Sequence, residues 1–159
     1  MGEDMLFVKG NAGTNIKLEF PTLSDISGSL INQAIIEMTY TTLPGDDPDI
    51  YPAPDQIYIM RDEGSVLVPI EDVNIAIARG NIGLFGGRPV DTEDENMVIT
   101  TTYSFNISDY LQDILDGEVA NEVMLSVIPR PTNASRGVFF GTDHATNPLK
   151  LRLLYSDVQ

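Results

Sequence analysis

Two acidic clusters in this chain carry carboxylates that could act as hard oxygen ligands. Asp46, Asp47 and Asp49 lie in the segment Leu43–Pro54, which also contains four prolines, and a second cluster occupies residues 91–95. Calcium prefers carboxylate oxygens, although neither cluster has the glycine and the distal glutamate of an EF-hand loop. Two interpretations stay open: solvated surface loops, or a calcium site at the first cluster, whose prolines could stiffen it.

Aromatic side chains and one arginine are the candidates for binding an organic ligand. Sugar-binding modules stack pyranose faces on exposed aromatic rings, and this chain has no Trp. Tyr51, in the proline-rich segment, and Tyr58, on an expected strand, are therefore the candidate platforms. Arg88, in a glycine-rich segment, could bind a carboxylate. The simpler interpretation is that both tyrosines pack against neighbouring prolines and strands and that Arg88 lies in solvent.

Groups for catalysis are sparse. His144 is the only histidine and Asp143 precedes it, but the chain has no G-x-S-x-G nucleophile elbow. A glycosidase needs two carboxylates facing each other across a cleft, and so many acidic residues single out no pair. The glycines between residues 80 and 87 are not followed by the Lys and Ser or Thr of a phosphate-binding loop. We predict that the protein is not an enzyme.

Charge and composition narrow the choice of partner. Nine basic and twenty-four acidic residues give a formal net charge of −15, which argues against binding nucleic acid or an anionic membrane surface. The absence of cysteine removes disulfides and thiolate chemistry. We find no apolar run of about 18 residues that would indicate a membrane span, and the start of the chain does not read as a signal peptide.

Two-residue alternation dominates the chain and predicts strands with one buried and one wet face. In Leu30–Tyr40, for example, Ala34, Ile36 and Met38 share one face, opposite Gln33 and Glu37. The nine predicted strands are Met5–Lys9, Asn15–Phe20, Leu30–Tyr40, Gln56–Met60, Val66–Ile70, Met97–Phe105, Glu122–Ile128, Arg136–Phe140 and Leu149–Tyr155.

A few segments depart from this alternation. Apolar residues at 107, 110, 111, 114 and 115 form the stripe of an amphipathic helix, with Asn106 or Ser108 as its N-cap and Gly117 placed to end it. A shorter helical turn is expected at Leu23–Ser27. Residues 72–79 fit either a strand or a short helix. Residues 80–96 carry no strong pattern and are expected to form a loop.

Three segments, taken in order, resemble a known family. The Phe20–Leu23 turn leads into Leu30–Met38, which contains I-N-Q-A-I-I; Tyr103–Gln112 reads Y-S-F-N-I-S-D-Y-L-Q; and Leu149–Tyr155 reads L-K-L-R-L-L-Y. Together they resemble the C-terminal part of a family of exported Bacteroidota lipoproteins with no assigned function. More distantly, they are similar to jelly-roll modules of secreted bacterial proteins, some of which bind polysaccharides. The resemblance implies an exported protein of the periplasm or outer-membrane surface, with its membrane tether upstream of this chain.

The sequence thus predicts a fold and leaves two functions open. We expect an all-β, jelly-roll-like antiparallel β-sandwich with one short amphipathic helix, formed by residues 1–159 as one domain of a longer exported precursor. The preferred function is a non-catalytic interaction or structural domain of the cell envelope, bound to another envelope protein or a surface glycan. The alternative is a carbohydrate-binding module, with or without calcium. The expected binding surface lies where the loops Leu43–Pro54 and Gly80–Asn96 meet at one end of the sandwich.

Overall fold

The computed structural model describes residues 4–11, 13–47, 50–64, 66–129 and 135–157. The strands in this part of the chain are β1 (Met5–Lys9), β2 (Ile16–Glu19), β3 (Ser29–Thr41), β4 (Ile57–Asp62), β5 (Leu67–Pro69), β6 (Gly86–Glu93), β7 (Ile99–Asn106), β8 (Glu122–Val127), β9 (Arg136–Phe140) and β10 (Lys150–Asp157). The helices are α1 (Glu71–Ala78) and α2 (Ser108–Leu115), and 3₁₀ turns lie at Leu23–Ile26 and Ile82–Leu84.

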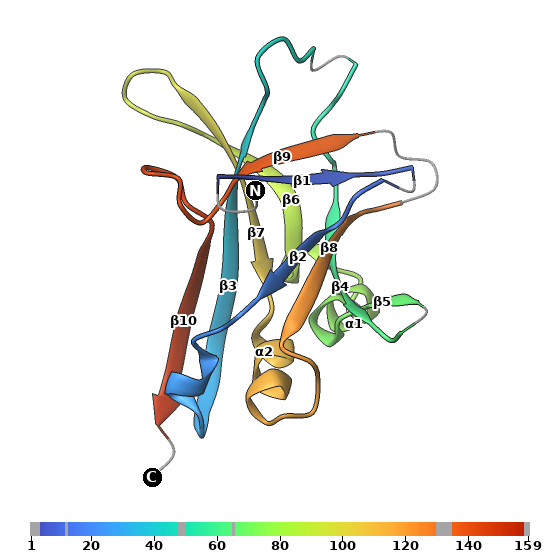
Figure 1. The fold of residues 1–159 in the computed structure, drawn as a ribbon, viewed down its shortest axis with the longest axis vertical. Coiled ribbons are helices and arrows are strands. Elements are labelled where there is room, and N and C mark those ends of the chain that lie inside the picture. The colour runs from blue at the N-terminus through green and yellow to red at the C-terminus, as the bar shows by residue number, and fades with distance from the viewer. Residues whose placement is uncertain (1–3, 12, 48–49, 65, 130–134, 158–159) are drawn as a thin grey trace.

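The strands form two antiparallel sheets that pack as a sandwich (Figure 1). One sheet has the order β1-β9-β3-β7-β6, with β10 also paired to β3, and the other has the order β2-β8-β4-β5. Without β6 and β10, the orders β1-β9-β3-β7 and β2-β8-β4-β5 are those of a jelly roll, in which two Greek keys share both sheets. The predicted all-β sandwich is confirmed, and all nine predicted strands are present within a few residues of their expected bounds.

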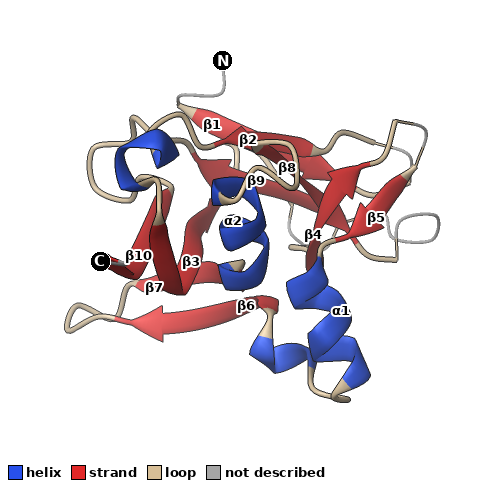
Figure 2. Cartoon of the chain, turned by 90° about the horizontal axis from the view of Figure 1, so that it is seen from below, coloured by secondary structure: helices blue, strands red, loops and turns tan. Residues whose placement is uncertain are grey.

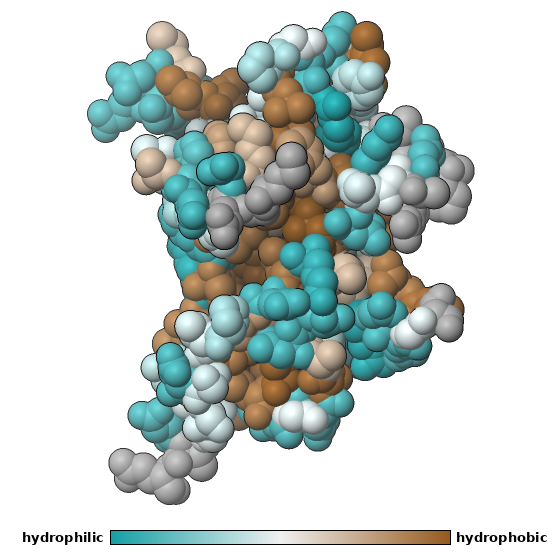
Figure 3. Space-filling view, viewed as in Figure 1, coloured by the Kyte–Doolittle hydropathy of each residue, from teal (hydrophilic) through white to brown (hydrophobic). Residues whose placement is uncertain are grey.

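The first sheet divides along β3, its longest strand. β3 pairs with β10 from Ser29 to Glu37 but with β9 only at Tyr40 and Thr41. As a result β1 and β9 turn away from β3 and β10 and run across the molecule, as Figure 1 shows. The space-filling view from the same side shows apolar surface exposed in the hollow that this divergence leaves (Figure 3).

Two helices lie at the lower end of the molecule. Seen from that end, α2 lies between the two sheets and α1 lies beside it (Figure 2). The amphipathic helix predicted after residue 106 is confirmed as α2, and Gly117 has the left-handed φ of +75° expected just beyond its end. The ambiguous segment 72–79 is helical, so the protein has α1 in addition to the one helix expected. The helical turn predicted at Leu23–Ser27 is also present.

The expected loop at residues 80–96 is the main error of the sequence-based prediction. About half of this segment is β6, an edge strand paired with β7. Gly86 and Gly87 have φ of +93° and +75°, and a Cβ at these positions would lie 2.2 Å and 2.1 Å from the carbonyl oxygens of Ser104 and Ile57. The glycines are therefore required by close backbone packing and positive φ, and they conceal a strand in what reads as a flexible turn.

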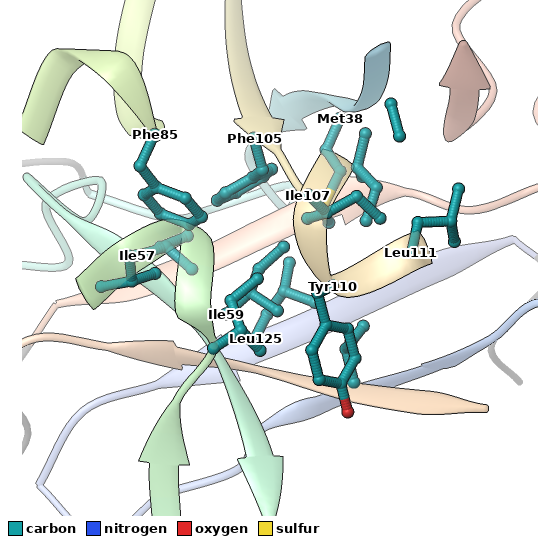
Figure 4. Close-up of a cluster of buried hydrophobic side chains, with 14 of the residues drawn as sticks. Met38, Ile57, Ile59, Phe85, Phe105, Ile107, Tyr110, Leu111 and Leu125 are labelled. Atoms are coloured by element: carbon teal, nitrogen blue, oxygen red, sulfur yellow. The ribbon is translucent and has the colours of Figure 1, made fainter. Parts of the chain in front are cut away.

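The core lies between the sheets and against α2 (Figure 4). Ala34, Ile36 and Met38, predicted to share one face of β3, all have no exposed side-chain surface. The larger buried side chains that meet them come from both sheets, from α2 and from the segment before β6; they include Ile57, Ile59, Phe85, Phe105, Ile107, Tyr110, Leu111 and Leu125. No helix in the described part of the chain has the length and apolar character needed to cross a membrane.

Candidate functional site

An apolar pocket of about 340 Å³ lies between β1 and β2, and we call it the β1–β2 groove. It is lined by Met5, Leu6, Phe7, Thr14, Asn15, Ile16 and Lys17. The two strands are joined at one end, where the amide of Lys9 donates to the carbonyl of Thr14 at 2.9 Å. They then diverge, because β1 pairs with β9 in one sheet and β2 pairs with β8 in the other.

Each of these strands has a free edge beside the groove. In the described part of the chain β1 pairs only with β9 and β2 only with β8. On the second edge of β1, the Lys9 amide and the Phe7 carbonyl bond to Thr14. The other backbone groups along the second edges of β1 and β2 have no partner strand among the described residues, and such edges can accept another strand. This arrangement follows from the jelly-roll order, in which β1 and β2 are edge strands of opposite sheets.

Apolar side chains form the interior of the groove. Ile16 is buried, Leu6 is half-buried, and Phe7 has 42% of its side chain exposed. Leu18 of β2 and Leu151 and Leu153 of β10 also pack against the core without being fully covered. Figure 3 shows apolar surface in the middle of this face of the molecule.

The outward face of β2 carries an excess of negative charge. The Lys17 ammonium lies 2.5 Å from a carboxylate oxygen of Glu122 and 3.1 Å from one of Glu19. Hydrogen bonds to Glu122 and then Glu19 raise the pKa of Lys17. Because two carboxylates share one ammonium, this group, which spans β2 and β8, has a formal net charge of −1 at neutral pH.

Tyr51 is held by an arginine. The Arg136 guanidinium lies over its ring, 4.4 Å from the centroid, and 40% of Tyr51 stays exposed. Arg136 also forms an ion pair with Asp46, whose carboxylate accepts a hydrogen bond from the Leu43 amide at 3.1 Å. Arg136 is the main cause that lowers the pKa of Asp46. Tyr51 is therefore an exposed ring with a cation fixed against it.

The hypothetical calcium ligands are only partly described. The Asp46 carboxylate is engaged by Arg136, and the backbone carbonyl of Asp47 accepts hydrogen bonds from the amides of Ile50 and Tyr51. Asp49 lies outside the described residues. Within the described ranges, no group of three or more His, Cys, Asp or Glu side chains is arranged to hold a metal ion. A calcium site at this cluster stays a prediction.

Tyr58 and Arg88 lie elsewhere, where β4 meets the start of β6. The Tyr58 ring is half-buried and packs edge-on against Phe85, with centroids 6.0 Å apart. Arg88 Nε donates to Gln56 Oε1 at 2.9 Å, and Gln56 Nε2 donates to the Gly86 carbonyl at 2.9 Å. The three predicted ligand-binding residues are thus not in one site. Tyr58 and Arg88 lie where β4 meets β6, whereas Tyr51 contacts Arg136.

His144 contacts the end of β9 and its own loop. Its ring stacks on Phe140, with centroids 3.7 Å apart and planes at 18°, and its Nδ1 accepts a hydrogen bond from the Asn147 amide at 3.0 Å. These contacts fix the ring at the end of β9.

The buried Asp72 at the α1–α2 contact was not anticipated. Its side chain is 7% exposed, and its carboxylate accepts hydrogen bonds from the amides of Asp109 and Tyr110 at 3.1 Å and 3.0 Å. Asp72 therefore caps the first turn of α2 from another helix. Burial raises the pKa of Asp72 to about 6, although the two amides act in the opposite direction.

Both predicted N-cap residues also contribute, in a linked arrangement. Asn106 Oδ1 accepts from the Ser108 amide at 3.2 Å and from its hydroxyl at 2.5 Å. The Ser108 hydroxyl in turn accepts from the Ala34 amide at 2.9 Å, which attaches α2 to β3. A smaller pocket of about 180 Å³ lies beside this junction and includes Asp72 and Arg79 in its lining.

The comparisons with known proteins gave no assignment. No protein-family model, no curated protein and no solved structure matches the chain.

Proposed function

We propose that this chain is a non-catalytic binding domain of an exported bacterial envelope protein, and that it holds another protein in the β1–β2 groove. The observation that carries the proposal is the combination of a 340 Å³ apolar pocket with an unpaired strand edge on each side. Envelope location rests on the resemblance to exported lipoproteins given by the sequence.

The groove favours a polypeptide over a small metabolite as the occupant. Small-molecule sites combine an apolar lining with a few convergent polar side chains, and this lining also includes Thr14, Asn15 and Lys17. The preference for a polypeptide therefore rests on the free backbone edges of β1 and β2 beside the pocket. Such edges bind other backbones, because each free N–H and C=O can join a ladder of hydrogen bonds.

Site-specific photocrosslinking tests this proposal directly. A photoreactive amino acid at Phe7, inside the groove, should give a covalent adduct with a discrete protein in cells that naturally produce this one. The matched control is the same replacement at Leu154 on β10, an exposed apolar residue that does not line the pocket. A partner captured equally from both positions, or from neither, would refute the assignment of the groove.

One observation favours a second function, carbohydrate binding. Tyr51 offers an exposed ring whose other side is fixed by Arg136, and a rigid aromatic face is what a pyranose ring stacks on. If this platform operates, a glycan that binds the wild-type protein on an array will be lost in Tyr51→Ala. Binding should persist in Tyr155→Ala, where the ring on β10 has a similar exposure of 44%. An array without any bound glycan would remove this candidate.

A further inference from the structure

We infer that the partner enters the β1–β2 groove as an extended, basic segment that adds a strand to the free edge of β2. This inference rests on the proposed function and states the form and charge of the partner. The structural basis is the open position beside β2, where the smaller sheet ends while the larger sheet continues.

The first argument is the incomplete cover over the core. Among the described residues, the smaller sheet has four strands and ends at β2, whereas the larger sheet contains six. Figure 1 shows the free edge of β2 facing the region where β1 diverges from β3 and β10. Leu18, Leu151 and Leu153 pack against the core but stay partly exposed. A fifth strand beside β2 would extend the smaller sheet over this apolar surface.

The side-chain pattern of β2 sets what such a strand must look like. Ile16 is buried and Leu18 is half-buried, while Lys17 and Glu19 are exposed. Strand neighbours place their side chains on matching faces of the sheet. An added strand therefore needs apolar side chains at alternate positions, directed into the groove, and polar side chains between them.

The charge around β2 determines which polar residues the added strand should carry. Lys17, the one cation on the described residues of β2, is already engaged by Glu19 and Glu122, and the Glu19 side chain is 65% exposed. The chain as a whole carries −15. Opposite charges on neighbouring strands are favourable and like charges are not, and the net field speeds the encounter with a cation. The outward positions of the partner should thus be Lys or Arg.

Synthetic peptides of about ten residues provide the test. We expect a peptide of alternating Val and Lys to bind saturably in isothermal titration, and a peptide of alternating Val and Glu not to bind. Binding should weaken as salt is raised. Equal affinity of the two peptides, or affinity of neither, would overturn the inference.

Two further arms separate strand addition from general attraction between opposite charges. Phe7→Lys, which places a cation in the groove, should weaken binding of the Val/Lys peptide by about tenfold or more, whereas Leu154→Lys on β10 should not. The second arm uses the wild-type protein and so does not depend on how a variant folds. Two versions of the Val/Lys peptide are compared, one methylated on the backbone nitrogens of all Val residues and the other on those of all Lys residues. These two sets of N–H groups point to opposite edges of the added strand, so one phase of methylation should abolish binding and the other should leave it unchanged. Equal loss in both phases, or no loss in either, would exclude pairing with an edge.

The result also distinguishes this inference from the function on which it rests. A partner crosslinked at Phe7 together with failure of the Val/Lys peptide would leave the groove as a binding site and remove strand addition. No crosslink at Phe7 together with peptide binding would remove the proposed cellular function and keep the capacity of the β2 edge to pair.

Discussion

The helical end of the sandwich, where α1 and α2 lie, differs from the β1–β2 groove in how far its polar backbone groups are hydrogen-bonded. At the helical end, side chains distant in sequence satisfy them: the Asp72 carboxylate caps α2, and Gln112 Oε1 accepts from the Ile31 amide at 2.8 Å. Asn121 similarly accepts from the Phe20 amide and donates to its carbonyl. At the groove, the outer edges of β1 and β2 have no partner strand in the described chain, and only Thr14 bonds to the β1 edge, at Phe7 and Lys9.

The difference shows which region of this fold is fully packed and which region can bind a partner. Fully packed regions with paired backbone groups open only at high free energy, and binding surfaces are drawn from less stable regions. The helical end combines buried aromatic packing with caps that fix α2 against β3. The groove combines apolar surface with free edges, so contacts that would complete it have to come from elsewhere.

The largest expected effect is a contrast in stability between these two regions. Tyr110 is 2% exposed and its hydroxyl donates to the Glu122 carbonyl at 3.2 Å. Tyr110→Ala should lower the free energy of unfolding by about 3–5 kcal/mol, and Phe7→Ala by less than about 1 kcal/mol. Urea denaturation at equilibrium measures both. Tyr110→Phe is the control that removes only the hydrogen bond, at a cost of about 1 kcal/mol.

Equal losses for Tyr110→Ala and Phe7→Ala would contradict the comparison. They would mean that the groove is as tightly packed as the helical end, and the case for an incomplete site would fail with it.

A smaller effect isolates the cap that joins α1 to α2. Both Asp72→Asn and Asp72→Ala remove the charge, but only asparagine keeps an oxygen that can accept from the α2 amides. The alanine variant should therefore be less stable than the asparagine variant by about 1–2 kcal/mol. Hydrogen exchange at the Asp109 and Tyr110 amides should be faster in the alanine variant. If the two variants match in both measurements, Asp72 does not act as the cap.

The strands could be predicted from the sequence because burial of one sheet face produces a two-residue alternation of apolar and polar residues. The two-residue alternation of Ala34, Ile36 and Met38 reports directly which face of β3 is buried. The three- and four-residue spacing of Tyr110, Leu111 and Ile114 likewise identified α2. In both elements a side chain's environment follows from its position along one regular element, so the chain itself carries the information.

Features that depend on two distant segments were not accessible in this way. The Asp72 cap joins residues 37 and 38 positions apart, and nothing in the sequence around Asp72 marks it as buried. β6 was missed because Gly86 and Gly87 serve a close approach to Ser104 and Ile57, which the sequence does not reveal. The β1–β2 groove arises from the pairing of adjacent strands with different sheets. The expected site residues Tyr51, Tyr58 and Arg88 were chosen by type, and the structure separates Tyr51 from the other two.

The smallest effect concerns pH and sharpens the account of the helical end. Burial raises the pKa of Asp72 to about 6 in the folded protein, against an ordinary value of 3.8. The folded state thus holds this proton more tightly than the unfolded state. The stability that protonation of Asp72 contributes is fully present below pH about 3.8 and is lost as pH rises through about 6. Between pH about 7 and about 5, the wild-type protein should gain about 1 kcal/mol relative to Asp72→Asn.

Urea denaturation of both proteins at the two pH values measures this difference. The asparagine variant is the necessary reference, because other carboxyl groups also contribute to the pH dependence of stability; burial raises the pKa of Asp113, for example. Parallel pH dependence of the two proteins would show that the amides of Asp109 and Tyr110 offset the burial of Asp72 completely. Asp72 would then be an ordinary carboxylate at neutral pH, and its burial at the helical end would not lower the free energy of unfolding.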